Sequence, residues 1–171
     1  MIKKNIKNNK RGFVLLFAVT LSAILLAIAL GVSNIALREV KFSTNTRDTN
    51  NAFFAADTAA ECALYYDRTP GSPNNYPNAF KASPDSMNCA GNSIVPTPSG
   101  VPDYWTFVVP KLGSGELGCA IVTVDKTNSA QYIILSKGYN TGSGGNNSLN
   151  WTCNPTENSV ERELEIKWKV D

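Results

Sequence analysis

The sequence predicts an α+β protein in which a long N-terminal helix packs on an antiparallel sheet of about four strands. First, an uncharged and mainly apolar run extends from Phe13 to Leu37, and an alanine-rich segment follows it to about Tyr66. Second, apolar and polar residues alternate with a period of two after residue 104, which is the period of strands. Third, prolines and glycines concentrate between these two regions, as expected for a connecting loop.

The first half of the helix is long and apolar enough to span a membrane. Twenty helical residues cover about 30 Å, the thickness of the hydrocarbon core of a bilayer. Residues 13–32 supply this length, and the hydroxyls of Thr20 and Ser22 can bond to carbonyls of their own helix. The alternative is a buried helix of a soluble protein, but a helix apolar on all sides over this length is typical of a membrane span.

Basic residues flank this run on one side only. Five of them precede it, and no acid does: Lys3, Lys4, Lys7, Lys10 and Arg11. By the positive-inside rule, the N-terminus stays in the cytoplasm and the chain from Arg38 onward is exported. We therefore expect a single-pass protein of the inner (cytoplasmic) membrane with an extracytoplasmic head domain.

The residues Arg11-Gly12-Phe13, with the basic leader and the long apolar run, resemble the class III signal of type IV pilins and type II secretion pseudopilins. The resemblance implies that a prepilin peptidase cuts between Gly12 and Phe13 and methylates the new amine of Phe13. Gly12 suits this role because a residue without a side chain lets a protease approach the backbone closely. The cut precedes the apolar run, so the mature chain keeps its membrane helix, unlike an ordinary secretory protein.

The fifth residue of that mature chain departs from the family pattern. Most pilins have a glutamate there, and this chain has Phe17. A carboxylate in lipid is costly unless it is paired. In the family it is thought to pair with the N-terminal amine of a neighbouring subunit during assembly. Some minor pilins and pseudopilins, including tip subunits, lack it, so the resemblance implies a minor or initiating subunit rather than the major one.

A second segment supports the same family. Residues 51–61 read Asn-Ala-Phe-Phe-Ala-Ala-Asp-Thr-Ala-Ala-Glu, similar to the Ala-Phe-Tyr-Ala-Ala-Asp-Ala-Gly-x-Glu stretch of PilX-like minor pilins. The two motifs lie in the first third of the chain, and the remainder matches the family by architecture only. The implied pilin-like organisation is a leader (1–12), a transmembrane helix half (13–37), an exported amphipathic helix half (38–66) and a head domain with a disulfide-stapled loop and a sheet (67–171).

The exported half of the helix carries a stripe of mostly small residues that would let a sheet approach closely. Its members recur at three- and four-residue spacings: Phe53, Ala56, Ala60, Ala63 and Leu64. The acids Asp57 and Glu61 and the pair Asp67–Arg68 are expected on a solvated face. Residues 43–51 are polar and poor helix formers, so a bend in this part of the helix is open.

Four cysteines lie in the part of the chain that is expected to be exported. An even number in such a segment favours two disulfides, although four free thiols remain the alternative. Three pairings are open. We favour Cys62–Cys89, which would tie a proline-rich irregular loop (69–103) to the helix, and Cys119–Cys153, which would tie a glycine- and asparagine-rich loop (140–157) to the sheet.

Four segments have the pattern of strands: Trp105–Val109, Cys119–Asp125, Tyr132–Tyr139 and Val160–Val170. In the last, charged residues from Glu161 to Lys169 alternate with the mainly apolar set from Arg162 to Val170. Such one-sided alternation is typical of an antiparallel sheet with one covered face. The helix Ala52–Tyr66 is the available cover. Lys126–Ser129 is the expected turn between the two middle strands.

The composition points to no catalytic residue, no cofactor and no metal site. The chain has no histidine, the commonest general base and metal ligand. The carboxylates of Glu161, Glu163 and Glu165 share one strand face, but Lys167 and Lys169 continue the row, so a charged sheet surface is the better interpretation. The stretch Gly142–Asn147 lacks the Lys-Ser/Thr of a phosphate loop and the acids of a calcium loop.

Charge also limits the class of partner. Removal of the leader takes away five positive charges and no negative ones, which changes the formal charge from +2 to −3 before the new amine is counted. This composition gives no case for nucleic-acid binding, although contact of the head domain with DNA stays open.

The preferred function is a structural minor pilin or pseudopilin of a type IV pilus or type II secretion-like filament, which primes assembly or lies at the tip. Its expected partners are the prepilin peptidase, other pilin subunits, the inner-membrane assembly platform and membrane lipid. One alternative is a signal-anchored extracytoplasmic binding module that does not polymerise. A second is a secreted protein cut near Ala27-Ile28-Ala29, and a third is an enzyme within the exported domain.

Overall fold

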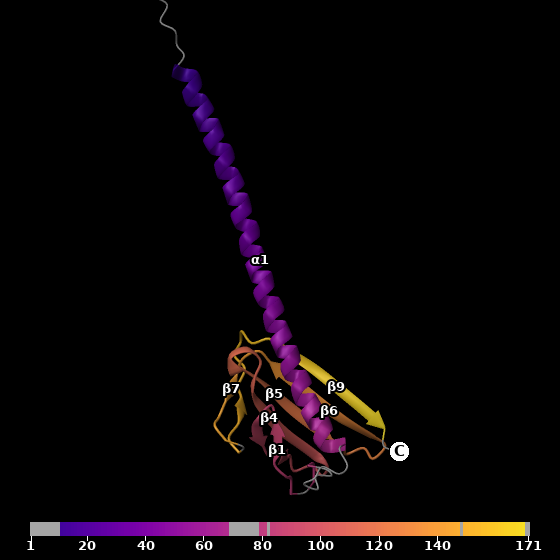
Figure 1. The fold of residues 1–171 in the computed structure, drawn as a ribbon. Coiled ribbons are helices and arrows are strands. Elements are labelled where there is room, and N and C mark those ends of the chain that lie inside the picture. The colour runs from indigo at the N-terminus through magenta and orange to yellow at the C-terminus, as the bar shows by residue number, and fades with distance from the viewer. Residues whose placement is uncertain (1–10, 69–78, 82, 148, 170–171) are drawn as a thin grey trace, which may run out of the picture. The chain divides into compact units, whose positions relative to one another are not determined.

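The computed structural model describes residues 11–68, 79–81, 83–147 and 149–169. The chain divides into two compact units, Met1–Thr44 and Asn45–Asp171. One long helix, α1 (Arg11–Arg68), and an antiparallel sheet of five strands confirm the predicted α+β class (Figure 1).

Helix α1 continues through the polar residues 43–51, where a bend was open, and it ends two residues beyond the predicted Tyr66. Polar side chains in this stretch can bond within their own helix. The Oγ1 of Thr44, for example, donates to the carbonyl oxygen of Val40 at 2.6 Å. A hydroxyl satisfied in this way does not compete for the backbone groups of the next turn.

The sheet has the strand order β3-β4-β5-β6-β9, and all neighbouring strands are antiparallel. The four long strands correspond to the four predicted segments, with ends shifted by at most three residues: β4 (Tyr104–Leu112), β5 (Gly118–Asp125), β6 (Gln131–Tyr139) and β9 (Glu161–Lys169). A short 3-10 helix, η1 (Ser114–Glu116), lies between β4 and β5. The fifth strand, β3 (Thr97–Pro98), is too short to show a period, and its proline is tolerated because β3 lies at the edge.

Alanines in the last part of α1 are buried, and Ala52 and Ala56 lie directly on β6. Six alanines of α1 are at most 1% exposed: Ala52, Ala55, Ala56, Ala59, Ala60 and Ala63. The hydroxyl of Ser136 donates to the carbonyl oxygen of Ala56 at 2.8 Å. A Cβ added to Gly138 would collide with the backbone of Ala52 and Ala56, so only glycine allows this approach. The predicted stripe is correct for its alanines but wrong for Phe53, which is 43% exposed.

The centre of the core lies between α1 and strands β4 to β6. Phe80 packs between two aromatic residues of β4, with ring centroids 5.9 Å from Trp105 and 6.0 Å from Phe107. The indole N–H of Trp105 donates to the carbonyl oxygen of Lys81 at 3.1 Å. These contacts bind the chain that follows α1 to the sheet.

Both segments predicted as irregular loops contain short hairpins. The first hairpin pairs β1 (Met87–Cys89) with β2 (Asn92–Ile94), and the second pairs β7 (Ser143–Gly144) with β8 (Thr152–Cys153). The first turn consists of Ala90 and Gly91, both at positive φ, which is the geometry of a type I′ turn. Alanine is an unusual residue at such a position, so this turn was not predictable from the residue types alone. Residues 69–78 of the predicted first loop lie outside the described residues.

Candidate functional site

The apolar first part of α1 is the most distinctive surface of the described chain. Its large apolar side chains between Phe13 and Leu37 are all exposed, from 48% at Leu21 to 75% at Phe13. By length and composition, one helix among the described residues could cross a membrane. An apolar surface this continuous is normally covered by lipid or by protein.

The hydroxyl groups within this run are satisfied internally, as predicted. The Oγ1 of Thr20 donates to the carbonyl oxygens of Phe17 and Leu16, at 2.9 and 3.1 Å. The Oγ of Ser22 donates to the carbonyl oxygen of Ala18 at 2.7 Å. Neither hydroxyl of residues 13–32 therefore needs a bond from water.

The predicted processing site lies at the start of α1. The leader residues 1–10 are outside the described residues, so cleavage between Gly12 and Phe13 and methylation of Phe13 stay predictions. Phe17, the fifth residue after the predicted cut, is 59% exposed on the helix surface. Its ring adds to the apolar surface at the position where the family resemblance leads one to expect a carboxylate.

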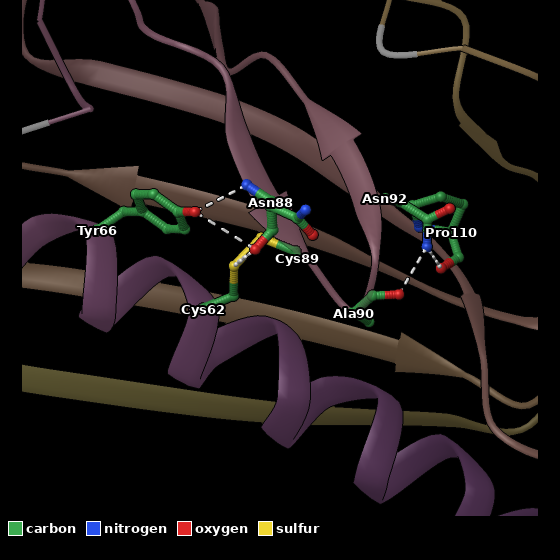
Figure 2. Close-up of a disulfide and its surroundings, with 7 residues drawn as sticks. All are labelled: Cys62, Tyr66, Asn88, Cys89, Ala90, Asn92 and Pro110. Carbon is green, nitrogen blue, oxygen red and sulfur yellow. Dashed lines mark hydrogen bonds between the residues drawn. A yellow bond between two sulfur atoms is a disulfide. The ribbon is translucent and has the colours of Figure 1, made fainter. Parts of the chain in front are cut away.

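The first disulfide, Cys62–Cys89, fixes the β1–β2 hairpin to α1, with Cα atoms 5.8 Å apart. Figure 2 shows Tyr66, one helical turn after Cys62, reaching the same hairpin. Its phenol oxygen accepts the N–H of Asn88 at 2.9 Å and donates to the carbonyl oxygen of Asn88 at 3.5 Å. The amide of Asn92 then donates to the carbonyl oxygen of Pro110 on β4 at 3.5 Å, so the hairpin links α1 to the sheet.

The second disulfide, Cys119–Cys153, fixes the β7–β8 hairpin to β5, with Cα atoms 5.7 Å apart. Both cysteines are buried, at 0% and 8% exposed, and they pack with Tyr139 of β6. The structure thus joins the two pairs that we favoured. Among the described residues, no group of three or more cysteines and acids lies close enough together to hold a metal ion.

The interpretation of Asp67 as a solvated acid is wrong. Asp67 forms an ion pair with Lys126, and the two side chains are only 4% and 8% exposed. The ammonium of Lys126 lies 5.1 Å from the ring centroid of Tyr132 and 5.7 Å from that of Phe80. The turn between β5 and β6 therefore folds over the last turn of α1. This turn shields the carboxylate of Asp67 from water.

The carboxylates of β9 form a charged surface with a lysine of β6. The ammonium of Lys137 lies 3.2 Å from Glu163 and 3.5 Å from Glu161. The hydrogen bond that Lys137 donates to Glu163 and the charge of Glu161 raise the pKa of Lys137. Burial, together with a hydrogen bond to Glu161, raises the pKa of the Tyr139 phenol. Both shifts keep the proton on its group, so Lys137 stays charged and Tyr139 stays neutral near neutral pH.

Two shallow clefts flank the short strand β3. The larger, about 340 Å³, lies between β2, β3 and β4 and is closed on one side by Leu149 and Trp151. Its polar side-chain groups are the hydroxyls of Thr97 and Thr106 and the indole N–H of Trp151, and none of its described lining residues carries a carboxylate, thiol or amine. The smaller, about 190 Å³, has Asp103 as its charged residue. Neither lining combines a nucleophile with a base, which nucleophilic catalysis requires.

The glycine-rich stretch Gly142–Asn147 builds part of the β7–β8 hairpin. Gly142 and Gly145 both have positive φ, and added side chains would strike the backbone of residues 150–155. The glycines thus allow a close turn rather than a ligand site.

The described residues combine an exposed apolar helix, a small sheet domain and two disulfides. Comparison with protein-family models, with curated proteins and with solved structures finds no match to this chain. The pilin family therefore remains a resemblance carried by residues 11–13 and 51–61.

Two structural features were not predicted from the sequence, and only one of them has a sequence signal. An isolated glycine inside a strand pattern, such as Gly138, is a known sign of close backbone approach. The partnership of Asp67 with Lys126 has no such sign, because 59 positions separate them and either residue alone is typical of a surface.

Proposed function

We propose that this chain is a minor pilin or pseudopilin, a structural subunit of a type IV pilus or type II secretion-like filament that primes assembly or lies at the tip. The observation that carries the proposal is the exposed apolar surface of α1 from Phe13 to Leu37. This helix continues into the segment that packs on a disulfide-containing sheet. A rod of this kind needs a non-aqueous partner, and a filament core of similar helices supplies one.

Storage in a membrane and assembly into a filament use the same surface. In the bilayer, residues 13–37 contact lipid, and in the filament they contact the equivalent helices of other subunits. Lipid tails are as apolar as leucine side chains, so this exchange supplies little net free energy. The assembly platform in the inner membrane therefore has to supply the work of extraction.

Phe17 favours a minor position over that of the major repeating subunit. A carboxylate at the fifth mature residue would have to find a partner in an apolar surrounding. Phe17 has no such requirement and cannot bond to the amine of a neighbouring subunit. The same residue also favours the runner-up function, a signal-anchored binding module that does not polymerise.

A processing variant separates the two functions in cells that carry the filament machinery. We expect the wild-type chain in filaments sheared from the cell surface, in amounts below those of the major subunit. Gly12→Leu should remain in the membrane as the uncut precursor and be absent from the sheared fraction. Glu116→Gln is the control, because Glu116 is exposed and lies outside the helix that the proposal places in the filament core. A wild-type chain confined to the membrane fraction would contradict the filament role.

A further inference from the structure

Strand β9 forms one edge of the sheet, and among the described residues it pairs only with β6 (Figure 1). The outer N–H and C=O groups of an edge strand can pair with a further strand. One face of β9 is exposed and charged, with acids first and bases last: Glu161, Glu163, Glu165, Lys167 and Lys169. The other face carries Leu164, Ile166 and Trp168, which are half-buried.

This order of charges is complementary to itself when one copy is reversed. In an antiparallel pair centred on Ile166, Glu163 lies opposite Lys169 and Glu165 lies opposite Lys167. The two-fold symmetry makes each contact twice, and opposite charges at facing positions stabilise a strand pair. We infer that β9 of one copy pairs antiparallel with β9 of a second copy, in a two-fold symmetric contact centred on Ile166.

The charges also select the register. A pair centred on Glu165 or on Lys167 would place that residue against its own copy, with like charges in contact. A pair centred on Leu164 would place Glu163 against Glu165. Of the registers centred between 164 and 167 that keep the charged faces together, only the one at Ile166 opposes every acid with a base over residues 163–169.

Within one copy, Glu165 already pairs with Lys167 at 2.7 Å, and in the contact each of them would also face the opposite charge of the second copy. Glu163 is held by Lys137 on its inner side at 3.2 Å, and Lys169 forms no ion pair among the described residues. Lys169 of the second copy would approach Glu163 from the outer side. The carboxylate would then lie between two ammonium groups, one from β6 and one from the facing strand.

The same register also buries apolar side chains on the other face of β9. Ile166 would face its own copy, and Leu164 would face Trp168, so side chains that are half-exposed in one copy become covered. The α1 segment lies over β6, as its contact with Gly138 shows. The two β6 strands would be about 14 Å apart, three strand spacings, which leaves room for two helices that need about 8–10 Å.

The symmetry of the contact determines the relative direction of the two copies. A two-fold axis perpendicular to the sheet reverses β9, and with it the segment Asn45–Arg68 that packs on the same sheet. The joined copies are therefore opposed to each other. They are not neighbours in one fibre whose subunits all point the same way, so the contact goes beyond the proposed filament function and does not depend on it.

Charge reversal tests the contact in the full oxidised chain, purified in detergent and measured by sedimentation velocity over a concentration series. Glu163→Lys/Glu165→Lys makes the charged positions from 163 to 169 all basic, and Lys167→Glu/Lys169→Glu makes them all acidic. We expect the wild type to self-associate, each double variant to associate at least tenfold more weakly, and an equimolar mixture of the two to regain wild-type association. The four-fold variant with both reversals should associate with itself again.

Two controls keep the test decisive. Glu116→Lys reverses an exposed charge away from β9 and should leave association unchanged, and far-UV circular dichroism reports whether each variant is folded. Ile166→Cys should give a symmetric intermolecular disulfide under mild oxidation, whereas Glu165→Cys should not. Folded double variants that associate like the wild type, or a mixture that does not associate, would overturn the inference.

Discussion

Gly138 sets how closely α1 approaches β6. A Cβ at this position would lie 2.8 Å from the Cα of Ala56 and closer still to neighbouring backbone atoms. Real side chains do not tolerate such a distance, and backbone atoms cannot turn aside as the end of a flexible side chain can. The small residues on both elements therefore act as a pair, and neither can be enlarged alone.

We expect Gly138→Ala to lower the free energy of unfolding by about 2 kcal/mol, within the range for overpacked cores. The helix would have to shift away from β6, which would loosen the bond from Ser136 to Ala56. Chemical denaturation of the oxidised chain in detergent measures the change. Gly31→Ala, which meets nothing within 4 Å, is the control and should be neutral or slightly stabilising. A neutral Gly138→Ala would show that the contact is looser than described.

The enclosed ion pair of Asp67 and Lys126 should be sensitive to loss of one partner. Asp67→Asn leaves the ammonium of Lys126 in a site where the side chains are 4% and 8% exposed. Removing one partner of a buried pair costs about 3–5 kcal/mol. The double variant Asp67→Leu/Lys126→Met should recover much of that loss, because no charge remains buried.

Denaturation midpoints of Asp67→Asn and of the double variant test this expectation. The matched control is Asp85→Asn, since Asp85 pairs with Lys81 at 2.6 Å but both side chains are more than 40% exposed. An exposed pair of this kind contributes about 0–1 kcal/mol. Equal effects of Asp67→Asn and Asp85→Asn would count against an enclosed pair at the end of α1.

Residue-level features were predictable from the sequence only when they were local. The hydroxyls of Thr20 and Ser22 bond to carbonyls within one turn, so helix geometry alone gives their partners. The ion pair of Asp67 with Lys126 depends on how the β5–β6 turn folds over α1, which no local pattern encodes. The exposure of Phe53 was missed because spacing along a helix gives a face but not its centre.

The two disulfides each tie a hairpin to a different element, and they close loops of similar length. The sequence separations are 27 for Cys62–Cys89 and 34 for Cys119–Cys153. In the chain-entropy account, such loops correspond to about 3.5 kcal/mol each. The hydrogen bonds of the five-stranded sheet do not depend on either disulfide. Removing a disulfide should therefore destabilise mainly the hairpin that it attaches.

We expect Cys62→Ser/Cys89→Ser and Cys119→Ser/Cys153→Ser to lower the free energy of unfolding by similar amounts, about 3 kcal/mol each. Urea denaturation measures both variants, and non-reducing peptide mapping of the wild type checks the pairing. A wild-type map that shows a different pairing, or four free thiols, would contradict the structure of both hairpins.

The contact between β6 and β9 makes stability dependent on alkaline pH. The pKa of Lys137 is raised from 10.5 by Glu163 and Glu161, and that of Tyr139 is raised from 10.0 by burial. Both groups hold their protons more tightly in the folded chain. Their contribution is therefore complete below the unfolded pKa values and is lost as pH rises through the folded ones.

We expect the free energy of unfolding to fall as pH rises above about 10 and to fall less steeply in Lys137→Met/Tyr139→Phe. Denaturation curves at a series of pH values compare the two slopes. An identical pH dependence in the variant would show that other groups dominate the alkaline transition.

Elements that repeat their pattern over many residues were predictable from the sequence, and elements of two or three residues were not. The four long strands and the helix each repeat their pattern over several residues, which is enough to identify their type. Strand β3 and the two hairpins have two or three residues per strand, so their patterns cannot be told from a loop. Disulfides and the turn at Ala90–Gly91 hold these elements in place, and the sequence shows the cysteines but not the geometry.

At the scale of the whole molecule, one chain contains two surfaces with opposite requirements. The exposed residues of α1 between Phe13 and Leu37 need an apolar surrounding, whereas the disulfide-containing unit has an ordinary polar surface. This division was predictable from composition alone, because lipid and water select residues so differently. The identity of the partner that covers the apolar surface depends on the machinery of the cell and is not encoded in any local pattern.

The central claim is that maturation removes the leader and leaves the apolar helix intact. Intact-mass spectrometry and N-terminal sequencing of the chain isolated from its own cells test it most directly. The account predicts a mature protein that begins with N-methylated Phe13 and retains all of α1 beyond it. A chain that still begins at Met1, or one that begins near Leu30 after loss of the apolar run, would contradict it.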